Sequence, residues 1–180
     1  KTEVYLQLIA QVLQAGKQAL VLVPEIGLTP QTIERFKARF DCEMAIFHSN
    51  LTDTQRLRHW QKARCGEARI IIGTRSALFT ATENLGLIIV DEEHDLSYKQ
   101  QDGLRYSARD TACMRAKLEN IPIVLGSATP TLESLHNAQT GKYLHWQLTE
   151  RAGNATPPTV EIIDIRRQHV ENGLADSLLP

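Results

Sequence analysis

A run of apolar residues that ends in a cluster of acids constrains this chain more than any other feature. Residues 85–95 read LGLIIVDEEHD, so the apolar stretch is followed at once by Asp91, Glu92, Glu93 and His94. Apolar runs without alternation are typical of parallel strands that helices cover on both faces. In open α/β sheets, ligands bind beyond the carboxyl ends of such strands. We therefore expect a ligand site at this acidic segment.

Neighbouring carboxylates at a strand end suit metal-assisted phosphate chemistry. One acid, here Asp91, would hold Mg²⁺, and the next, Glu92, would orient or deprotonate the attacking water. The alternative is a solvated acidic turn without a catalytic role, because charge runs usually lie on the surface. The other motifs of the chain favour the metal site.

Strand and helix patterns alternate along the chain. Strands are predicted at Ala19–Glu25, Met44–Phe47, Ile70–Gly73, Leu87–Asp91 and Ile123–Gly126. Helices are predicted from the start to about Gly16 and at Thr29–Phe40, Thr52–Ala63, Ser107–Asn120 and Thr131–Thr140. This alternation predicts βαβ units, and hence an α/β fold with a doubly wound, mostly parallel sheet.

The chain changes character near its end. After Trp146 it becomes rich in turn-forming residues, with one further strand predicted at Val160–Ile165. We interpret residues 1–148 as one lobe, and 149–180 as a strand and linker toward another domain. The chain begins with Lys1 rather than Met, directly in a helical pattern, so we expect it to belong to a longer protein.

The composition indicates which classes of protein and which kinds of site the chain can form. Of the 180 residues, 42% are hydrophobic and 23% charged, no apolar stretch approaches the length of a membrane span, and we expect a cytoplasmic protein without a membrane partner. With a net charge of −1, nucleic-acid binding would have to rest on local patches. Three cysteines without C-x-x-C spacing argue against a zinc site and a disulfide framework.

Two short motifs could complete a nucleotide site. Lys1 and Thr2 stand where a phosphate-binding loop, G-x-x-x-x-G-K-T, would end, although its glycines are not in this chain. In such a loop the lysine reaches the phosphates and the hydroxyl binds Mg²⁺. GSATPT at 126–131 follows another strand, so Ser127 and Thr129 could bond to the acids or to His94. The alternative is an ordinary strand–turn–helix connection.

Two further strand exits lead into hydroxyl-rich turns. VPEIGLTPQ contains Thr29, and GTRSALF contains Thr74 and Arg75. Helix starts and small hydroxyl residues bind phosphates, so these turns could hold a nucleic-acid backbone.

Residues 97–110, SYKQQDGLRYSARD, interleave aromatic and basic side chains. The residues concerned are Tyr98, Lys99, Arg105, Tyr106 and Arg109. This mixture is suited to stacking on unpaired bases and to contact with phosphates. The alternative is a surface loop whose tyrosines cover the core.

The motifs KT, GTRSALF, DEEH and GSATP, in this order, resemble motifs I, Ib, II and III of superfamily 2 helicases. KTEVY, VPEIGLTPQT and SYKQQ are similar to the bacterial primosomal replication-restart helicases, which are of DEAH type, and the resemblance extends to about Asp164. It implies the first RecA-like, P-loop NTPase lobe of an ATP-dependent 3′-to-5′ DNA helicase.

The resemblance also assigns roles. It implies phosphate binding by Lys1, Mg²⁺ binding by Thr2 and Asp91, water activation by Glu92, coupling by His94, Ser127 and Thr129, and DNA sensing by the segment Tyr98–Arg109. The implied cofactors are ATP and Mg²⁺, with zinc confined to the second lobe. The implied partners are single-stranded and forked DNA, primosome proteins and single-stranded-DNA-binding proteins. Without the loop glycines, the isolated chain is expected to hydrolyse little ATP.

Two alternatives remain open. The chain could be a non-catalytic module that binds nucleotide, DNA or a partner protein through the same fold. It could also belong to an ATPase that translocates on duplex DNA. The aromatic and basic loop favours unpaired DNA, because stacking platforms are useful mainly on unpaired bases.

Overall fold

The computed structural model describes residues 1–149, 159–160, 162, 164, 166, 170–171 and 174–175. They divide into two compact units, Lys1–His145 and Trp146–Pro180. The helices of the first unit are α1 (Thr2–Gln14), α2 (Pro30–Arg39), α3 (Asp53–Arg64), α4 (Ala108–Glu119) and α5 (Leu132–Gln139), with short 3-10 turns η1 (Glu25–Gly27), η2 (Arg75–Phe79) and η3 (Leu96–Tyr98). Its strands are β1 (Gln18–Leu22), β2 (Met44–Phe47), β3 (Ile70–Gly73), β4 (Leu85–Asp91), β5 (Lys99–Gln100), β6 (Tyr106–Ser107) and β7 (Ile123–Gly126).

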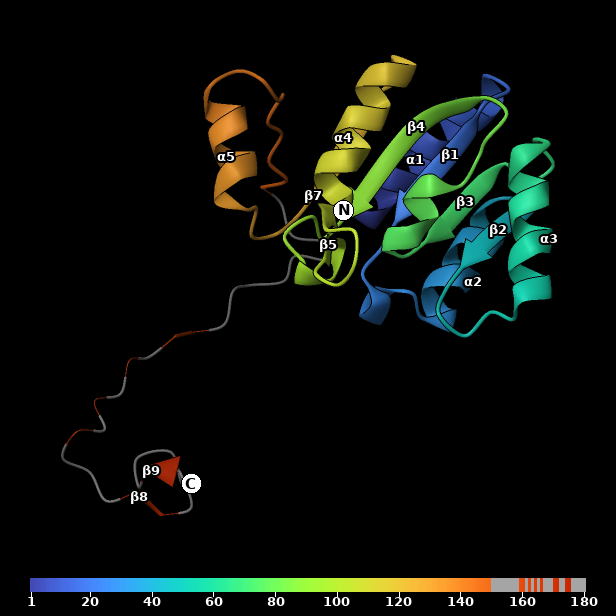
Figure 1. The fold of residues 1–180 in the computed structure, drawn as a ribbon. Helices are drawn as coiled ribbons and strands as arrows, with labels where there is room; N and C mark the ends of the chain where they lie inside the picture. Colours follow the sequence, from blue (N-terminus) through green and yellow to red (C-terminus); the bar gives the residue numbers. More distant parts are fainter. Residues whose placement is uncertain are drawn as a thin grey trace. The chain divides into compact units, whose positions relative to one another are not determined.

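A five-stranded sheet forms the centre of the first unit, in the order β2-β3-β1-β4-β7 (Figure 1). All its neighbouring strands pair in parallel. After β1 the chain builds β2 and β3 on one side, and then β4 and β7 on the other. The strand order therefore changes direction between β1 and β4, which is where open α/β sheets bind ligands.

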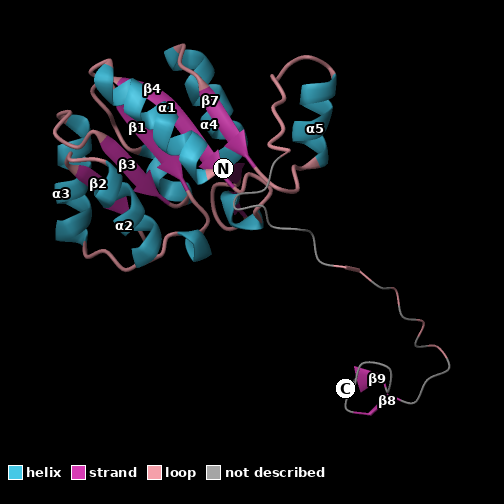
Figure 2. Cartoon of the chain, turned by 180° about the vertical axis from the view of Figure 1, so that it is seen from behind, coloured by secondary structure: helices cyan, strands magenta, loops and turns pink. Residues whose placement is uncertain are grey.

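Helices cover both faces of the sheet. Alternate strand residues pack with Tyr5, Ile9 and Phe36, so α1 and α2 lie on one face. The intervening residues pack with Ala63 of α3 and Ala112 of α4 on the other. Figure 2 shows the same layers from behind, with α5 beside the β7 edge. The predicted doubly wound α/β fold is confirmed.

The helix starts follow from local chemistry. Thr29 accepts a hydrogen bond from the Thr32 N–H, and Pro30 occupies the first turn of α2. Thr52 and Gln55 form a reciprocal capping box at the start of α3. Hydroxyls therefore fix where these two helices begin.

Two regions of the first unit differ from the prediction. The first strand was predicted at Ala19–Glu25, but β1 ends at Leu22. The strand ladder cannot continue through Pro24, because proline has no N–H to donate, and the 3-10 turn η1 follows. In addition, β5 and β6 pair in an antiparallel ladder within the aromatic and basic loop, which the sequence analysis did not predict.

The second unit contains a small hairpin of β8 (Val170–Glu171) and β9 (Leu174–Ala175). Asn172 and Gly173 separate these strands in the sequence, a pair typical of tight hairpins, and this signal was missed. The strand predicted at Val160–Ile165 is wrong for 160, 162 and 164, which have no regular structure, whereas 161, 163 and 165 lie outside the described residues.

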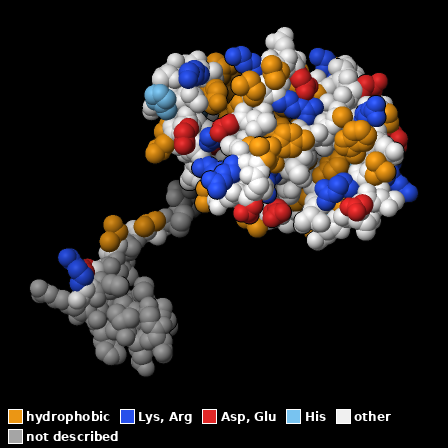
Figure 3. All heavy atoms as spheres, viewed as in Figure 1, with side chains coloured by type: hydrophobic (Ala, Val, Ile, Leu, Met, Phe, Trp, Pro, Cys, Tyr) orange, Lys and Arg blue, Asp and Glu red, His pale blue; other side chains and the backbone are white. Residues whose placement is uncertain are grey.

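The face of the molecule shown in Figure 3 has no dominant sign of charge. Figure 3 shows acidic, basic and apolar side chains interspersed over the face in view. Within the described residues, no helix has the length and apolar character needed to cross a membrane.

Candidate functional site

The acidic segment follows the carboxyl end of β4. Asp91 is the last residue of this strand, and Glu92 begins the next turn with a φ of +47°. This is the left-handed region, which residues other than glycine rarely adopt. The Asp95 N–H donates to the Glu92 carbonyl at 2.8 Å and closes the turn. Strained backbone of this kind is concentrated at functional sites.

Lys1 reaches these acids from the start of α1. Its Nζ donates to Glu92 Oε1 at 2.5 Å and lies 3.9 Å from Asp91 Oδ1. The three side chains are 29–36% exposed, so water screens the pairs and an anion can compete for the ammonium. Thr2 begins α1, but its hydroxyl forms no hydrogen bond with the acids among the described residues. The structure thus brings Lys1, Asp91 and Glu92 together.

Two buried tyrosines hold Asp91. The Tyr5 hydroxyl donates to Asp91 Oδ1 at 2.9 Å, and the Tyr98 hydroxyl donates to the Asp91 main-chain carbonyl at 2.7 Å. Burial first, and the charge of Asp91 second, raise the pKa of both tyrosines, so both remain donors. A Cβ at Gly126 would overlap the Tyr5 hydroxyl, which explains a glycine at the end of β7.

The GSATPT segment contacts the residue that follows the acids. Ser127 Oγ lies 2.7 Å from His94 Nδ1, and the Thr129 N–H donates to the same oxygen at 2.9 Å. His94 Nδ1 also lies 3.7 Å from Glu92 Oε2. The structure therefore places His94, Ser127 and Thr129 together beside Glu92.

Glu93 points away from this open group into the molecule. Its side chain is 1% exposed, and it accepts hydrogen bonds from the Thr131 N–H at 2.8 Å and from Ser134 Oγ at 3.0 Å. Arg109 Nη1 donates to Glu93 at 3.2 Å and to Thr131 Oγ1 at 2.6 Å. Glu93 thus joins the end of β4 to the first turns of α4 and α5.

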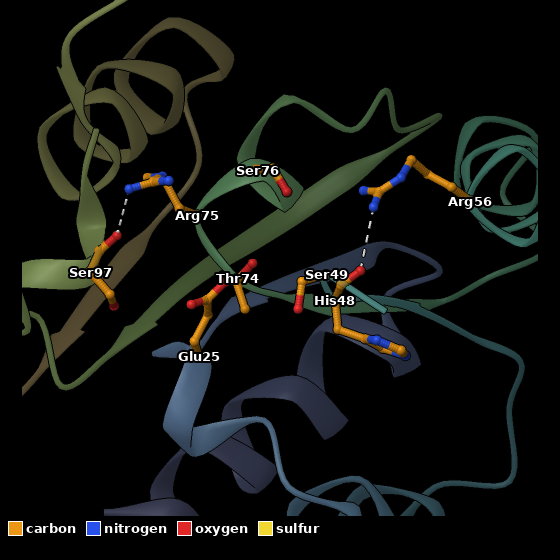
Figure 4. A pocket seen from close by; sticks show the side chains of 8 residues that line it. All are labelled: Glu25, His48, Ser49, Arg56, Thr74, Arg75, Ser76 and Ser97. Carbon is orange, nitrogen blue, oxygen red and sulfur yellow. Dashed lines mark hydrogen bonds between the residues drawn. The ribbon is translucent and has the colours of Figure 1, made fainter. Parts of the chain in front are cut away.

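A pocket of about 270 Å³ lies at the ends of β1, β2 and β3. Its walls come from the turns that follow these strands, from α3 and from η3 (Figure 4). The lining residues are Glu25, His48, Ser49, Arg56, Thr74, Arg75, Ser76 and Ser97. Two arginines among hydroxyl side chains give the pocket the donors that a phosphate oxygen accepts.

The family model described as DEAD/DEAH box helicase matches residues 1–138. The chain belongs to this family. The matched range includes the acidic segment Asp91-Glu92-Glu93-His94 at the end of β4.

Two curated relatives and one solved structure are similar to this chain. Replication restart protein PriA of Haemophilus influenzae is 60% identical over 99% of this chain, and that of Bacillus subtilis is 49% identical over 96%. The chain covers 24% and 21% of these proteins, so it spans about a quarter of their length. A solved structure of RecG bound to a three-way DNA junction matches 78% of the chain and 18% of that chain, with a TM-score of 0.53 and 25% identity. The fold is therefore that of a RecA-like helicase lobe.

Two residues predicted to contact DNA lie inside this DEAD/DEAH box domain. Tyr98 is 2% exposed, so its ring cannot stack on a base in this structure, and its hydroxyl is bonded to Asp91. The Arg109 side chain is 11% exposed and is bonded to Glu93, Thr131 and Asp110. The burial of Tyr98 corrects the prediction that its ring stacks on a base, and Arg109 bonds to side chains of the protein itself in this structure.

The other predicted DNA contacts lie at the surface or in the pocket. Lys99 and Arg105 are exposed. Tyr106 is half-buried, with its ring centroid 5.2 Å from that of Phe79 in an edge-on contact. Thr74 and Arg75 line the pocket, whereas Thr29 caps α2 and is not among the lining residues.

Sequence reasoning missed several residues of the site. Tyr5 and Arg56 carried no local signal, since each reaches its position only through the packing of α1 or α3. His48 and Ser49 follow β2 directly, so the rule that ligands bind at strand ends could have identified them.

Proposed function

We propose that this chain is part of an ATP-dependent 3′-to-5′ DNA helicase that acts in replication restart and primosome assembly. The observation that carries the proposal is the convergence of Lys1, Asp91 and Glu92 at the end of β4 in a DEAD/DEAH box domain. A cation beside two acids suits phosphoryl chemistry, in which the protein positions water and stabilises charge.

The residues present suit a Mg²⁺ ion that is shared with a nucleotide. Among the described residues, no group of three or more His, Cys, Asp or Glu side chains could hold a metal by itself. The oxygens of Asp91 and Thr2 are of the type that Mg²⁺ prefers, and Mg²⁺ commonly takes its other ligands from water and phosphates. Bound Mg²⁺ would neutralise phosphate charge during hydrolysis.

Lys1 and Glu92 would change partners during binding. The Lys1 ammonium is now hydrogen-bonded to Glu92. Phosphate oxygens would compete for this ammonium, and the freed Glu92 carboxylate would then orient the attacking water. His94 and Ser127, beside Glu92, would carry the change to the segment that precedes α5.

The pocket at the ends of β1, β2 and β3 would hold the DNA backbone. Arg56 and Arg75 offer charge-assisted donors, and the exposed Lys99 and Arg105 lie in the neighbouring loop. Such contacts would position single-stranded DNA without reading its sequence.

The test is ATP hydrolysis by the full-length protein on single-stranded, forked and duplex DNA, with and without Mg²⁺. We expect Mg²⁺-dependent hydrolysis that single-stranded and forked DNA stimulate, and displacement of a strand from substrates with a 3′ tail but not a 5′ tail. Stimulation by duplex DNA alone would instead indicate a duplex translocase. An absence of hydrolysis on all three DNAs would indicate a non-catalytic binding module.

A further inference from the structure

A chain of hydrogen bonds leads from the pocket to the backbone of Asp91. Arg75, the first residue of η2, lines the pocket. Its Nη1 donates to the main-chain carbonyls of Ser97 and Lys99, at 3.0 Å in both cases. Figure 4 shows the bond from Arg75 to Ser97. The two carbonyls flank Tyr98, so one guanidinium nitrogen holds the short turn that carries this tyrosine.

Tyr98 continues the connection to the acids. Its ring is 2% exposed, and its hydroxyl donates to the Asp91 carbonyl at 2.7 Å. A side chain packed this tightly has no free volume in which to change rotamer, so a shift of η3 is transmitted to its hydroxyl. Asp91 would then move against the second tyrosine, Tyr5, which bonds to its carboxylate.

Arg75 can accept a ligand without releasing the turn. Only its Nη1 is used for the two carbonyls. Its Nε and Nη2 groups have no protein partner among the residues that the structure describes, and they are the remaining donors of a planar fork. A phosphate can therefore bind the free donors while Nη1 stays on Ser97 and Lys99.

We propose that Arg75 and Tyr98 act as positioning residues that couple a DNA phosphate in the pocket to the Mg²⁺-binding acid, Asp91. The proposal rests on the proposed function, because it needs both ligands to bind. A phosphate that draws on Arg75 would shift the Ser97–Lys99 turn, and the Tyr98 hydroxyl would pass this shift to the Asp91 carbonyl. Tyr98 thus senses DNA from within the core rather than by stacking.

Thermodynamic linkage supplies the measurement. If DNA and Mg²⁺-nucleotide are coupled, each changes the affinity for the other by the same factor. We would measure the Kd of the full-length protein for a labelled thymidine oligonucleotide, with and without a non-hydrolysable ATP analogue and Mg²⁺, at one salt concentration. The ratio of the two Kd values is the coupling factor, and it requires no turnover.

We expect a coupling factor of about fivefold or more in the unaltered protein, as is typical of coupled sites. Tyr98→Phe keeps the buried ring and removes only the hydroxyl bond, so the factor should fall below about twofold while the Kd without nucleotide stays within about twofold. Tyr143→Phe is the matched control, because it also removes a tyrosine hydroxyl contact, to Cys113 on α4. It should leave the factor unchanged.

Arg75→Lys provides a second, independent variant. Lysine keeps the charge but lacks the fork that joins the carbonyls to a phosphate, so it should lower both DNA affinity and the coupling factor. The double variant should lose no more coupling than the stronger single variant, because both residues act in one path.

The outcomes separate the two proposals. If the unaltered protein fails to bind the oligonucleotide or the nucleotide, the proposed function is wrong, and the coupling proposal is wrong with it. If both bind and Tyr98→Phe retains the full coupling factor, only the coupling proposal is wrong. The losses of the two single variants could also add in the double variant, when the coupling factors are expressed as free energies. Arg75 and Tyr98 would then act on separate paths, and the proposal would be overturned.

Discussion

The polar side chains at the two ends of the central sheet differ in burial and in how completely they are hydrogen-bonded. At the amino end, Gln18 is 2% exposed, and its amide donates to the carbonyls of Ala63 and Ala68 at 2.8 and 2.7 Å. Its side-chain oxygen accepts from the N–H groups of Glu83 and Asn84. At the carboxyl end, Lys1, Asp91 and Glu92 are about one third exposed and have donors and acceptors to spare.

This difference distinguishes stability from chemistry within one sheet. A buried polar group with all its hydrogen bonds made rigidifies the fold. A partly exposed group on a strained backbone can exchange partners with a ligand. Structural and chemical roles differ even between adjacent residues. Glu93 is buried with its carboxylate hydrogen-bonded on both oxygens, whereas the Glu92 carboxylate is partly exposed. The contrast predicts which substitutions change activity and which change stability.

The largest effect is expected for Glu92→Gln in the full-length protein. The change keeps the shape and removes the carboxylate that would act on water, so turnover should fall by about two to four orders of magnitude. The unfolding free energy should stay within about 0.5 kcal/mol, because the Glu92 side chain is about one third exposed and not part of the core. ATPase rates and urea unfolding measure the two quantities.

Glu3→Gln is the matched control for this change, since Glu3 is an exposed acid of α1 whose side chain, within the part of the chain that the structure describes, is hydrogen-bonded to Gln7 alone. It should retain turnover. If Glu92→Gln hydrolysed ATP at an unreduced rate, the Glu92 carboxylate would have no role in hydrolysis.

Glu93→Ala should instead act on stability. It removes the buried acceptor and leaves Arg109 and Thr131 without their shared partner. Breaking a buried ion pair on one side costs about 3–5 kcal/mol, so the urea midpoint should fall markedly. Removing Arg109 as well should cost less than the sum of the single changes. A loss under about 1 kcal/mol would show that Glu93 is not a structural node.

At the opposite end, Gln18→Leu should cost about 3 kcal/mol of unfolding free energy, because main-chain groups that bond to the amide lose their partner in the interior. Gln7→Leu, on the exposed side of α1, should change the unfolding free energy by less than about 0.5 kcal/mol. The Mg²⁺ dependence of nucleotide binding should be the same in both variants. An altered Mg²⁺ dependence in Gln18→Leu would connect the two ends of the sheet.

The sequence predicts the open site better than the buried contacts. The acids and His94 follow a strand directly, so the rule for strand ends placed them correctly. Gln18, in contrast, meets Ala63 and Asn84 only after α3 and β4 have packed. Tyr98 was misjudged because aromatic and basic residues produce the same local pattern whether the ring faces solvent or core. Its burial depends on β4 and α4, which the loop sequence does not contain.

The smallest effect, and the sharpest test of the comparison, is expected for Tyr5→Phe. Tyr5 is 5% exposed, but its hydroxyl bonds to the open carboxylate of Asp91, so it connects the structural and the chemical side. Removing one buried hydrogen bond costs about 1 kcal/mol, which corresponds to about fivefold in binding. The Mg²⁺ concentration for half-maximal binding of an ATP analogue should therefore rise severalfold.

Gly126→Ala separates the position of this hydroxyl from its presence. The added methyl group would displace the Tyr5 hydroxyl from Asp91, so it should raise the Mg²⁺ requirement in the same direction although tyrosine is retained. Tyr143→Phe serves as the control, and it should leave the Mg²⁺ requirement unchanged. If neither Tyr5→Phe nor Gly126→Ala alters the Mg²⁺ requirement, Tyr5 only fills space between α1 and β4. The hydrogen bond from the buried Tyr5 hydroxyl would then contribute nothing to Mg²⁺ binding at Asp91.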